Sequence, residues 1–137
     1  MILIDTNIVV ALIARKDVHH QAAFALIGAL GAERLLIPAP VLTEMFFLLH
    51  RKVHYRAAVQ AVVVITRTFE VVDLLGEDYQ RMAAIMTQYA GAKFDFADAA
   101  IMALSERLGI TRVATLDRRD FGLFRPSHCD ALELLPS

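Results

Sequence analysis

Short apolar runs that alternate with helix-length segments are the feature that most constrains the fold of this 137-residue chain. A strand inside a parallel sheet is buried on both faces, so it reads as a continuous apolar run, and each parallel neighbour is reached through a crossover connection. The runs of this kind are Ile2–Ile4, Leu35–Ile37, Glu70–Leu74, Arg112–Thr115 and Ala131–Leu135. The alternation therefore predicts an α/β fold in which helices cover both faces of a parallel sheet.

The segments between these runs are predicted as helices by their length and by the capping and stop residues near their ends. They are Ile8–Ala14, Asp17–Leu30, Val41–His50, Tyr55–Thr68, Glu77–Tyr89 and Phe96–Leu108. Pro38 and Pro40 stop the second strand and lead into the third helix. No repeat, low-complexity stretch or linker interrupts the series, so we expect one domain over residues 1–137.

The charge balance excludes bulk electrostatic binding of nucleic acid. Lys and Arg number 14 against 15 Asp and Glu, which gives a net charge of −1. Any contact with a polyanion must therefore come from a local patch. The apolar stretches are shorter than the roughly 20 residues that a membrane span needs, and no signal-peptide pattern precedes the first strand. We expect a cytoplasmic protein that makes no membrane contact.

The apolar content predicts a surface for a protein partner. Hydrophobic residues make up 57% of the chain, above the roughly 45–50% that is usual in globular domains. In the segment Tyr55–Thr68, the side chains of Val59, Val62, Val63 and Ile65 surround more of the helix than one core-facing stripe requires. This helix is the candidate for the partner surface.

Four carboxylates hold positions that predict a common site. Asp5 directly follows the first strand and Asp117 follows the fourth, and open α/β sheets bind ligands beyond the carboxyl ends of their strands. Glu44 and Asp98 interrupt strongly apolar helices, where an unpaired carboxylate is costly. Because these residues lie near the first turns of segments that begin at one end of the sheet, we expect them to converge there.

Each carboxylate also has a structural interpretation. Asp5 can cap the helix after it, Asp117 can belong to a turn, and Glu44 can lie on a solvated stripe. Asp95 and Asp98 have the spacing of a helix cap and its third residue. We interpret Asp95 as a helix-capping residue and Asp120 as a turn residue.

A cluster of carboxylates favours a hard divalent cation. Like charges repel and raise one another's pKa values unless a cation neutralises them. Mg²⁺ or Mn²⁺ prefers carboxylate oxygens, and such an ion acidifies water and bridges phosphate oxygens. Zinc is disfavoured, because Cys129 is the only cysteine and the five histidines form no dense cluster.

Four motifs follow one another along the chain: the opening Ile2-Leu-Ile-Asp5-Thr-Asn7, Glu44 early in an apolar helix, Phe94-Asp-Phe-Ala-Asp98-Ala-Ala-Ile101 and Thr115-Leu-Asp117-Arg-Arg-Asp120-Phe121. These motifs resemble those of PIN-domain ribonucleases. Their order and spacing over the whole chain are similar to those of the VapC-type toxins of bacterial and archaeal toxin–antitoxin pairs.

The resemblance implies a three-layer α/β/α sandwich with a mainly parallel sheet and a Mg²⁺ or Mn²⁺ site that hydrolyses RNA. It implies that Asp5 and Asp98 are the principal metal ligands, Glu44 the third acid and Asp117 the fourth, at the family's most variable position. It further implies a homodimer and a cognate antitoxin protein. Arg118 and Arg119 are candidate phosphate contacts, although a solvated basic turn explains them equally well.

Two other functions fit parts of the pattern. The loop after the first strand resembles the nucleophile loop of haloacid-dehalogenase-type phosphatases, but Asn7 stands where that family has a second Asp, and no lysine has a telling context. A receiver-like, non-catalytic Mg²⁺-binding domain would place its phosphoacceptor near Asp73 and a lysine after its last strand, where this chain has none. The sequence favours the ribonuclease.

Overall fold

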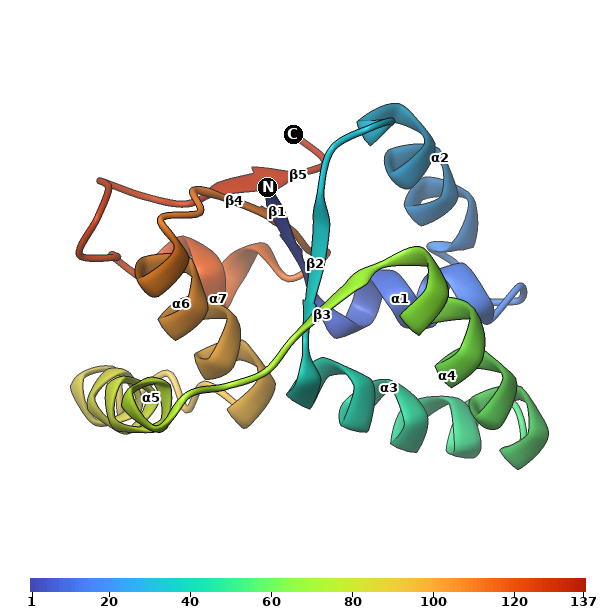
Figure 1. The fold of residues 1–137 in the computed structure, drawn as a ribbon, viewed down its shortest axis with the longest axis horizontal. Helices are drawn as coiled ribbons and strands as arrows, with labels where there is room; N and C mark the ends of the chain where they lie inside the picture. The colour runs from blue at the N-terminus through green and yellow to red at the C-terminus, as the bar shows by residue number, and fades with distance from the viewer.

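A computed structural model describes all 137 residues and contains one five-stranded sheet in which every neighbouring pair is parallel (Figure 1). The strands are β1 (Ile2–Ile4), β2 (Leu35–Pro38), β3 (Glu70–Val72), β4 (Arg112–Ala114) and β5 (Glu133–Leu135). They lie in the order β3-β2-β1-β4-β5. The chain therefore builds outward from β1 in one direction and later resumes on its other side, so the strand order reverses between β1 and β4. Such a switch point forms a crevice at the carboxyl ends of the strands.

Seven helices surround the sheet. They are α1 (Thr6–Ile13), α2 (His20–Leu30), α3 (Ala39–Lys52), α4 (Tyr55–Thr68), α5 (Gly76–Gln88), α6 (Phe96–Leu108) and α7 (Arg118–Leu123). Figure 1 shows α1, α2 and α4 on one side of the sheet and α5, α6 and α7 on the other, which confirms the three-layer α/β/α sandwich. None of these helices combines the length and the apolar character that a membrane crossing requires.

The middle of the core consists of β1 and α6. All three residues of β1 are fully buried, and α6 is buried from Ala97 through Ser105. Helix α6 is apolar on nearly every side because it packs against α3, α5, α7 and β2. Its first turn, which carries Asp98, is therefore held rigidly at the carboxyl edge of the sheet.

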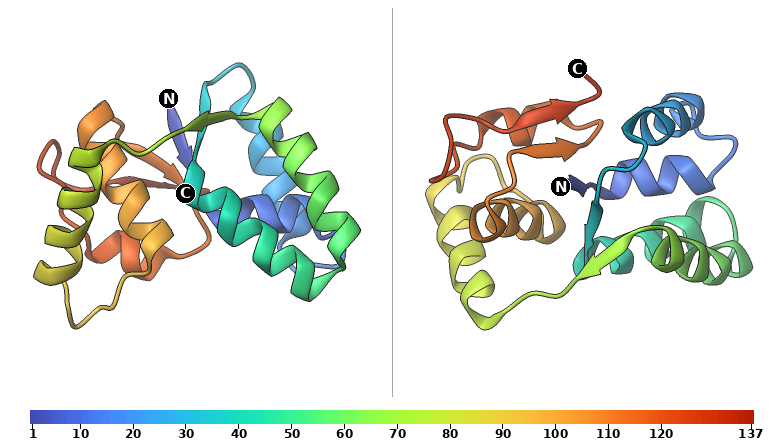
Figure 2. Two further views of the ribbon diagram at one scale, coloured as in Figure 1. Left: turned by 60° about the horizontal axis from the view of Figure 1, so that its bottom comes forward. Right: turned by 45° about the horizontal axis from the view of Figure 1, so that its top comes forward.

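Helix α3 joins the two helical layers at this edge. It starts directly after β2, and it contacts α1 and α4 in one layer and α6 in the other (Figure 2). Pro40 lies inside its first turn, where a missing backbone N–H costs nothing, rather than before the helix as the sequence predicted.

Local hydrogen bonds explain three further differences from the predicted elements. Helix α1 begins at Thr6, two residues early, because Asp5 caps it. Helix α2 begins only at His20, since the Asp17 carboxylate accepts the His19 N–H in a turn. The predicted turn after Asp117 is instead the short helix α7, which Asp117 caps.

The apolar face of α4 is partly as predicted. Val59, Val62 and Val63 are exposed, as a partner surface requires, whereas Ile65 is buried in the core. Ile65 belongs to the stripe of α4 that faces the core, with Ala58 and Ala61, so the three valines are the residues that extend beyond this stripe.

Candidate metal-binding active site

The four predicted carboxylates lie around one cavity at the carboxyl edge of the sheet. Asp5, Glu44, Asp98 and Asp117 all line a hollow of about 320 Å³, hereafter the acidic cavity. Asp5 follows β1 and Asp117 follows β4, so these two flank the switch point, while α3 and α6 bring Glu44 and Asp98 to the same place. Asp17 and Asp95 add two further carboxylates to the lining, against a single lysine.

Asp5 both caps a helix and faces the acidic cavity. Its Oδ1 accepts the Thr6 N–H at 2.7 Å, which is the cap of α1. Its Oδ2 accepts the Thr115 hydroxyl at 2.7 Å and the Asn7 amide at 3.2 Å. Because carboxylate oxygens have further lone pairs, these contacts fix the orientation of Asp5 and leave acceptor capacity for a cation.

Asn7 and Thr115 join the loops that follow β1 and β4. Asn7 Oδ1 accepts the Leu116 N–H at 3.1 Å, and Thr115 Oγ1 accepts the Asp117 N–H at 2.9 Å. The sequence alone predicted no role in the site for either side chain. The sequence feature that could have identified them is a polar residue just beyond a buried strand, at the same edge of the sheet as Asp5 and Asp117.

Asp98 is free for a ligand because Asp95 does the capping. Asp95 Oδ1 accepts the Asp98 N–H at 2.8 Å, as its cap assignment predicted. The Asp98 carboxylate accepts no hydrogen bond from the protein, although the residue is only 7% exposed. The reciprocal half of a capping box is thus missing, and the carboxylate lines the acidic cavity instead.

Asp120 joins the cluster from α7. One carboxylate oxygen from each of Asp98, Asp117 and Asp120 lies within 4.8 Å of the other two. Asp117 also caps α7, accepting the N–H groups of Arg119 and Asp120 at 3.1 Å and 3.3 Å. The assignment of Asp120 to a turn was therefore incomplete. A cap residue and the third residue after it meet across the first helical turn, and this spacing was the available signal.

Burial and mutual repulsion oppose the charges of these carboxylates. Burial raises the pKa of Asp5 to about 6. Burial, followed by the charges of Asp5 and the neighbouring carboxylates, raises the pKa of Asp98 to about 9. Burial also raises the pKa values of Glu44 and Asp120. At Glu44, the Thr6 hydroxyl partly offsets this rise in pKa. A divalent cation with oxygen ligands relieves this cost, so the donor set fits Mg²⁺ or Mn²⁺.

A basic residue that the sequence did not suggest also lies at the acidic cavity. Arg118 and Arg119 are exposed on α7, and the Arg118 guanidinium donates to the Pro136 carbonyl oxygen at 2.6 Å. Lys52 lines the acidic cavity itself. With Arg15 and Lys16 it also lines a neighbouring hollow of about 560 Å³, hereafter the basic pocket. This pocket was not predicted from the sequence, because it forms only where the ends of α1 and α3 meet.

Comparison with known proteins finds one matching family model and several similar proteins. The model of the PIN domain family matches residues 2–124. Ribonuclease VapC26 of Mycobacterium tuberculosis is 28% identical over 129 residues, which cover 90% of this chain and 92% of the relative. The structure of M. tuberculosis VapC20, described as a sarcin–ricin-loop-cleaving toxin, superimposes with a TM-score of 0.80 at 23% identity, covering 87% of this chain and 92% of that one. VapBC2 of Rickettsia felis, solved bound to a promoter DNA fragment, gives a TM-score of 0.73 at 17% identity, with 98% and 97% covered.

Proposed function

Since this chain belongs to the PIN-domain family, we propose that it is a metal-dependent endoribonuclease, acting in the cytoplasm as the toxin of a toxin–antitoxin pair. The observation that carries the proposal is the convergence of Asp5, Glu44, Asp98 and Asp117 on one cavity at the switch point of the sheet. The relative VapC26 is named a ribonuclease, which supports RNA as the substrate, and VapC20 is named a sarcin–ricin-loop-cleaving toxin.

The carboxylates of the acidic cavity would hold Mg²⁺ or Mn²⁺. Asp5 and Asp98 are the principal ligands in this proposal, with Glu44 as the third acid and Asp117 as the fourth. Asp120 stands close enough to Asp98 and Asp117 to share an ion or to bind its waters. When bound, the metal supplies an acidified water and electrostatic stabilisation of the phosphate oxygens.

The chain's own residues orient this site. The Thr115 hydroxyl and the Asn7 amide hold Asp5 in one orientation, so that little reorganisation is needed when substrate arrives. Lys52 is the one lysine in the acidic cavity, where it attracts a phosphate to a site that is otherwise negative.

The partner surface is the exposed valine face of α4, next to an apolar hollow of about 330 Å³ between α1, α2 and α4. Phe24 and Val64 line this hollow and are more than half exposed. We propose that it takes an apolar segment of an antitoxin, since the structural relatives include toxin–antitoxin complexes. A homodimer of the toxin, the other partner that we propose, would then use a different face.

The decisive test is cleavage of a mixed pool of structured RNA with and without Mg²⁺ or Mn²⁺. We expect cleavage that EDTA abolishes, that Asp98→Asn loses and that Asp130→Asn keeps, because Asp130 is exposed and forms no ion pair. Hydrolysis of p-nitrophenyl phosphate without RNA cleavage would instead identify a phosphatase, for which the loop has Asn7 in place of the second acid.

A further inference from the structure

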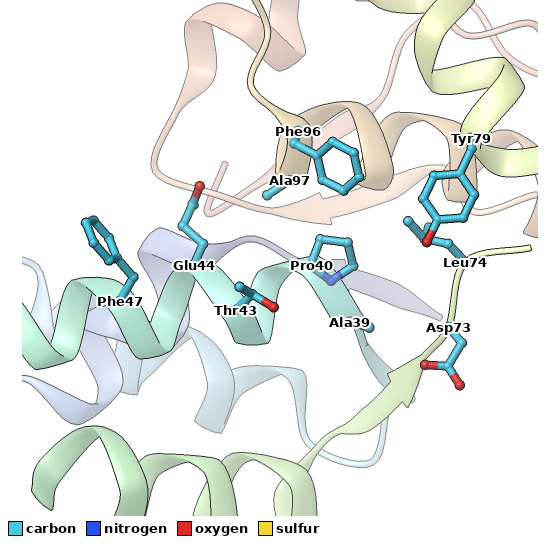
Figure 3. Close-up of a pocket in the computed structure, with 10 residues that line it drawn as sticks. All are labelled: Ala39, Pro40, Thr43, Glu44, Phe47, Asp73, Leu74, Tyr79, Phe96 and Ala97. Atoms are coloured by element: carbon cyan, nitrogen blue, oxygen red, sulfur yellow. The ribbon is translucent and has the colours of Figure 1, made fainter. Parts of the chain in front are cut away.

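A second hollow opens directly beside the acidic cavity. It has a volume of about 770 Å³, and Glu44 lines both spaces. We call it the aromatic groove, after Phe47, Tyr79 and Phe96 in its lining. Figure 3 shows Glu44 between Phe47 on one side and Phe96 with Tyr79 on the other. The groove is therefore continuous with the candidate site of phosphodiester hydrolysis.

The three aromatic rings of the groove lie outside the hydrophobic core. Phe47, Tyr79 and Phe96 are 54%, 49% and 52% exposed, and they come from three different helices, α3, α5 and α6. Tyr79 and Phe96 lie with ring centroids 6.4 Å apart and planes inclined by 38°. Exposed rings gathered in one groove mark a surface that a ligand covers.

The charge of the groove selects the kind of ligand. Glu44 and Asp73 are its only charged lining residues, so it repels phosphate. A nucleobase fits better, because every base has a face that stacks on aromatic rings and most bases have amino groups that donate to carboxylates. The groove thus suits the base of a nucleotide whose phosphate lies elsewhere.

The basic pocket adjoins the acidic cavity at other lining residues and has the complementary charge. The basic pocket shares Asp17 and Lys52 with the acidic cavity, just as the aromatic groove shares Glu44. Arg15, Lys16 and Lys52 are exposed there, and none of them forms an ion pair within the protein. The aromatic groove and the basic pocket therefore each adjoin the acidic cavity through shared lining residues.

We propose that a single-stranded RNA segment binds along this track. A base stacks in the aromatic groove, the phosphate to be cleaved lies at the acidic cavity, and a neighbouring phosphate binds in the basic pocket. The segment is single-stranded because a base in a duplex is already stacked, whereas loops present splayed bases. The proposal rests on the ribonuclease function above and adds the residues that select the substrate.

The test measures binding of a short fluorescein-labelled RNA strand and of the same strand without bases, in the cleavage-deficient Asp98→Asn chain with Mg²⁺. Adding Tyr79→Leu or Phe96→Leu keeps apolar bulk but removes stacking, so we expect binding of the base-bearing strand to weaken about 5- to 100-fold. Binding of the strand without bases stays unchanged. Tyr79→Phe retains the ring and the affinity, and Phe24→Leu, an exposed ring outside the track, is the matched control.

The salt dependence of binding separates the two ends of the track. The aromatic variants leave the slope of log affinity against log salt unchanged, while Lys16→Gln and Lys52→Gln each reduce it by about 0.7. Melting temperatures confirm that the variants remain folded.

Two results would overturn the track. One is equal affinity of the aromatic variants and their parent for the base-bearing strand. The other is a loss of binding together with a change in sedimentation, which would assign the groove to a second copy of the chain. A wild-type chain that cleaves no RNA in the pool assay refutes the proposed function, whereas cleavage that persists beside unchanged binding refutes only the track.

Discussion

Asp98 is the residue at which stability and the proposed activity conflict most directly. Its carboxylate is nearly buried, accepts no hydrogen bond and faces several like charges. Asp98→Asn removes this repulsion and a proposed metal ligand at once. We expect RNA cleavage to fall on the order of 10²-fold or more, while the melting temperature of the metal-free protein stays equal or rises.

The cap at Asp95 supplies the matched control for this prediction. Asp95→Asn retains the cap of α6 because Asn caps nearly as well as Asp, whereas Asp95→Ala costs about 1 kcal/mol of stability. Thermal melts and cleavage assays on the same samples compare the three variants. An Asp98→Asn chain that is destabilised yet active would contradict the ligand assignment.

Thr115 is expected to act on the metal through Asp5. Thr115→Val keeps the shape of the side chain but removes the hydroxyl that bonds both Asp5 Oδ2 and the Asp117 N–H. We expect metal affinity to fall 10- to 100-fold, as for other groups that orient ligands. Thr115→Ser should restore most of it. Calorimetric titration with Mn²⁺ measures the affinity, and equal values for the Val and Ser variants would refute the positioning role.

At this scale the sequence predicted which carboxylates converge but not how they are oriented. Asp5 and Asp117 were predictable because the carboxyl ends of parallel strands share an edge. The roles of Asn7 and Thr115 were not predictable. They depend on hydrogen bonds between two loops, and the bonded residues are separated by 108 or 109 positions in the chain. Lys52 was missed because the pocket that it lines forms only where the ends of α1 and α3 meet.

Two ion pairs join α5 to α6, and they differ in kind from the surface pairs. Arg107 bonds Asp78, which is almost fully buried, and Arg81 bonds Glu106. Through these contacts α5, which carries Tyr79, is held against α6, which carries Phe96 and Asp98. The alignment of the aromatic groove with the acidic cavity therefore depends on this helix pair.

Breaking the buried pair is expected to cost far more than breaking an exposed one. Arg107→Gln leaves the buried Asp78 carboxylate without its cation, so we expect a loss of about 3 kcal/mol in the free energy of unfolding. Arg34→Gln breaks the exposed pair with Glu70 and should cost less than about 1 kcal/mol. Urea denaturation of both variants measures the difference, and similar losses would contradict the distinction.

The sequence predicted the bounds of a helix where the helical pattern was long. It missed a helix whose formation depends on one capping residue. Helices α4 and α6 have the predicted bounds, because each has an extended helical pattern with end signals. Helix α7 has six residues, too few for a periodic signal, and forms because Asp117 caps it against the edge of the sheet. Its formation is what brings Asp120 into the acidic cluster.

The many apolar residues of the chain occupy three places in the folded molecule. A sheet covered on both faces needs a large core, and the core includes all of β1 and most of α6. The remaining apolar side chains gather on α4 with its neighbouring hollow and in the aromatic groove. The sequence predicted the first surface from one helix. It did not predict the second, since Phe47, Tyr79 and Phe96 meet only in the fold.

The raised pKa values of Asp5 and Asp98 make the acidic cavity a source of stability that is lost as pH rises. The pKa values of Asp5 and Asp98 are raised to about 6 and about 9 from a usual value of 3.8. Between about pH 4 and pH 9 the folded protein therefore binds protons that the unfolded chain has released. Since stability falls with pH wherever the native state binds more protons, the metal-free protein should melt at progressively lower temperature across this range.

Mg²⁺ should reverse this loss, because metal and protons compete for the same oxygens. An ion that binds only the folded state stabilises it by about 2.7 kcal/mol at a hundredfold excess over Kd, a shift on the order of 10 °C. The shift should be larger at pH 8 than at pH 6, where bound protons must first leave. Asp98→Asn should flatten both the pH dependence and the metal response, while Asp130→Asn should keep both. Melting curves at the two pH values, with EDTA or with Mg²⁺, measure the pH dependence and the metal response of both variants. An Asp98→Asn chain with the wild-type response would place the metal, and with it the chemistry, outside the acidic cavity.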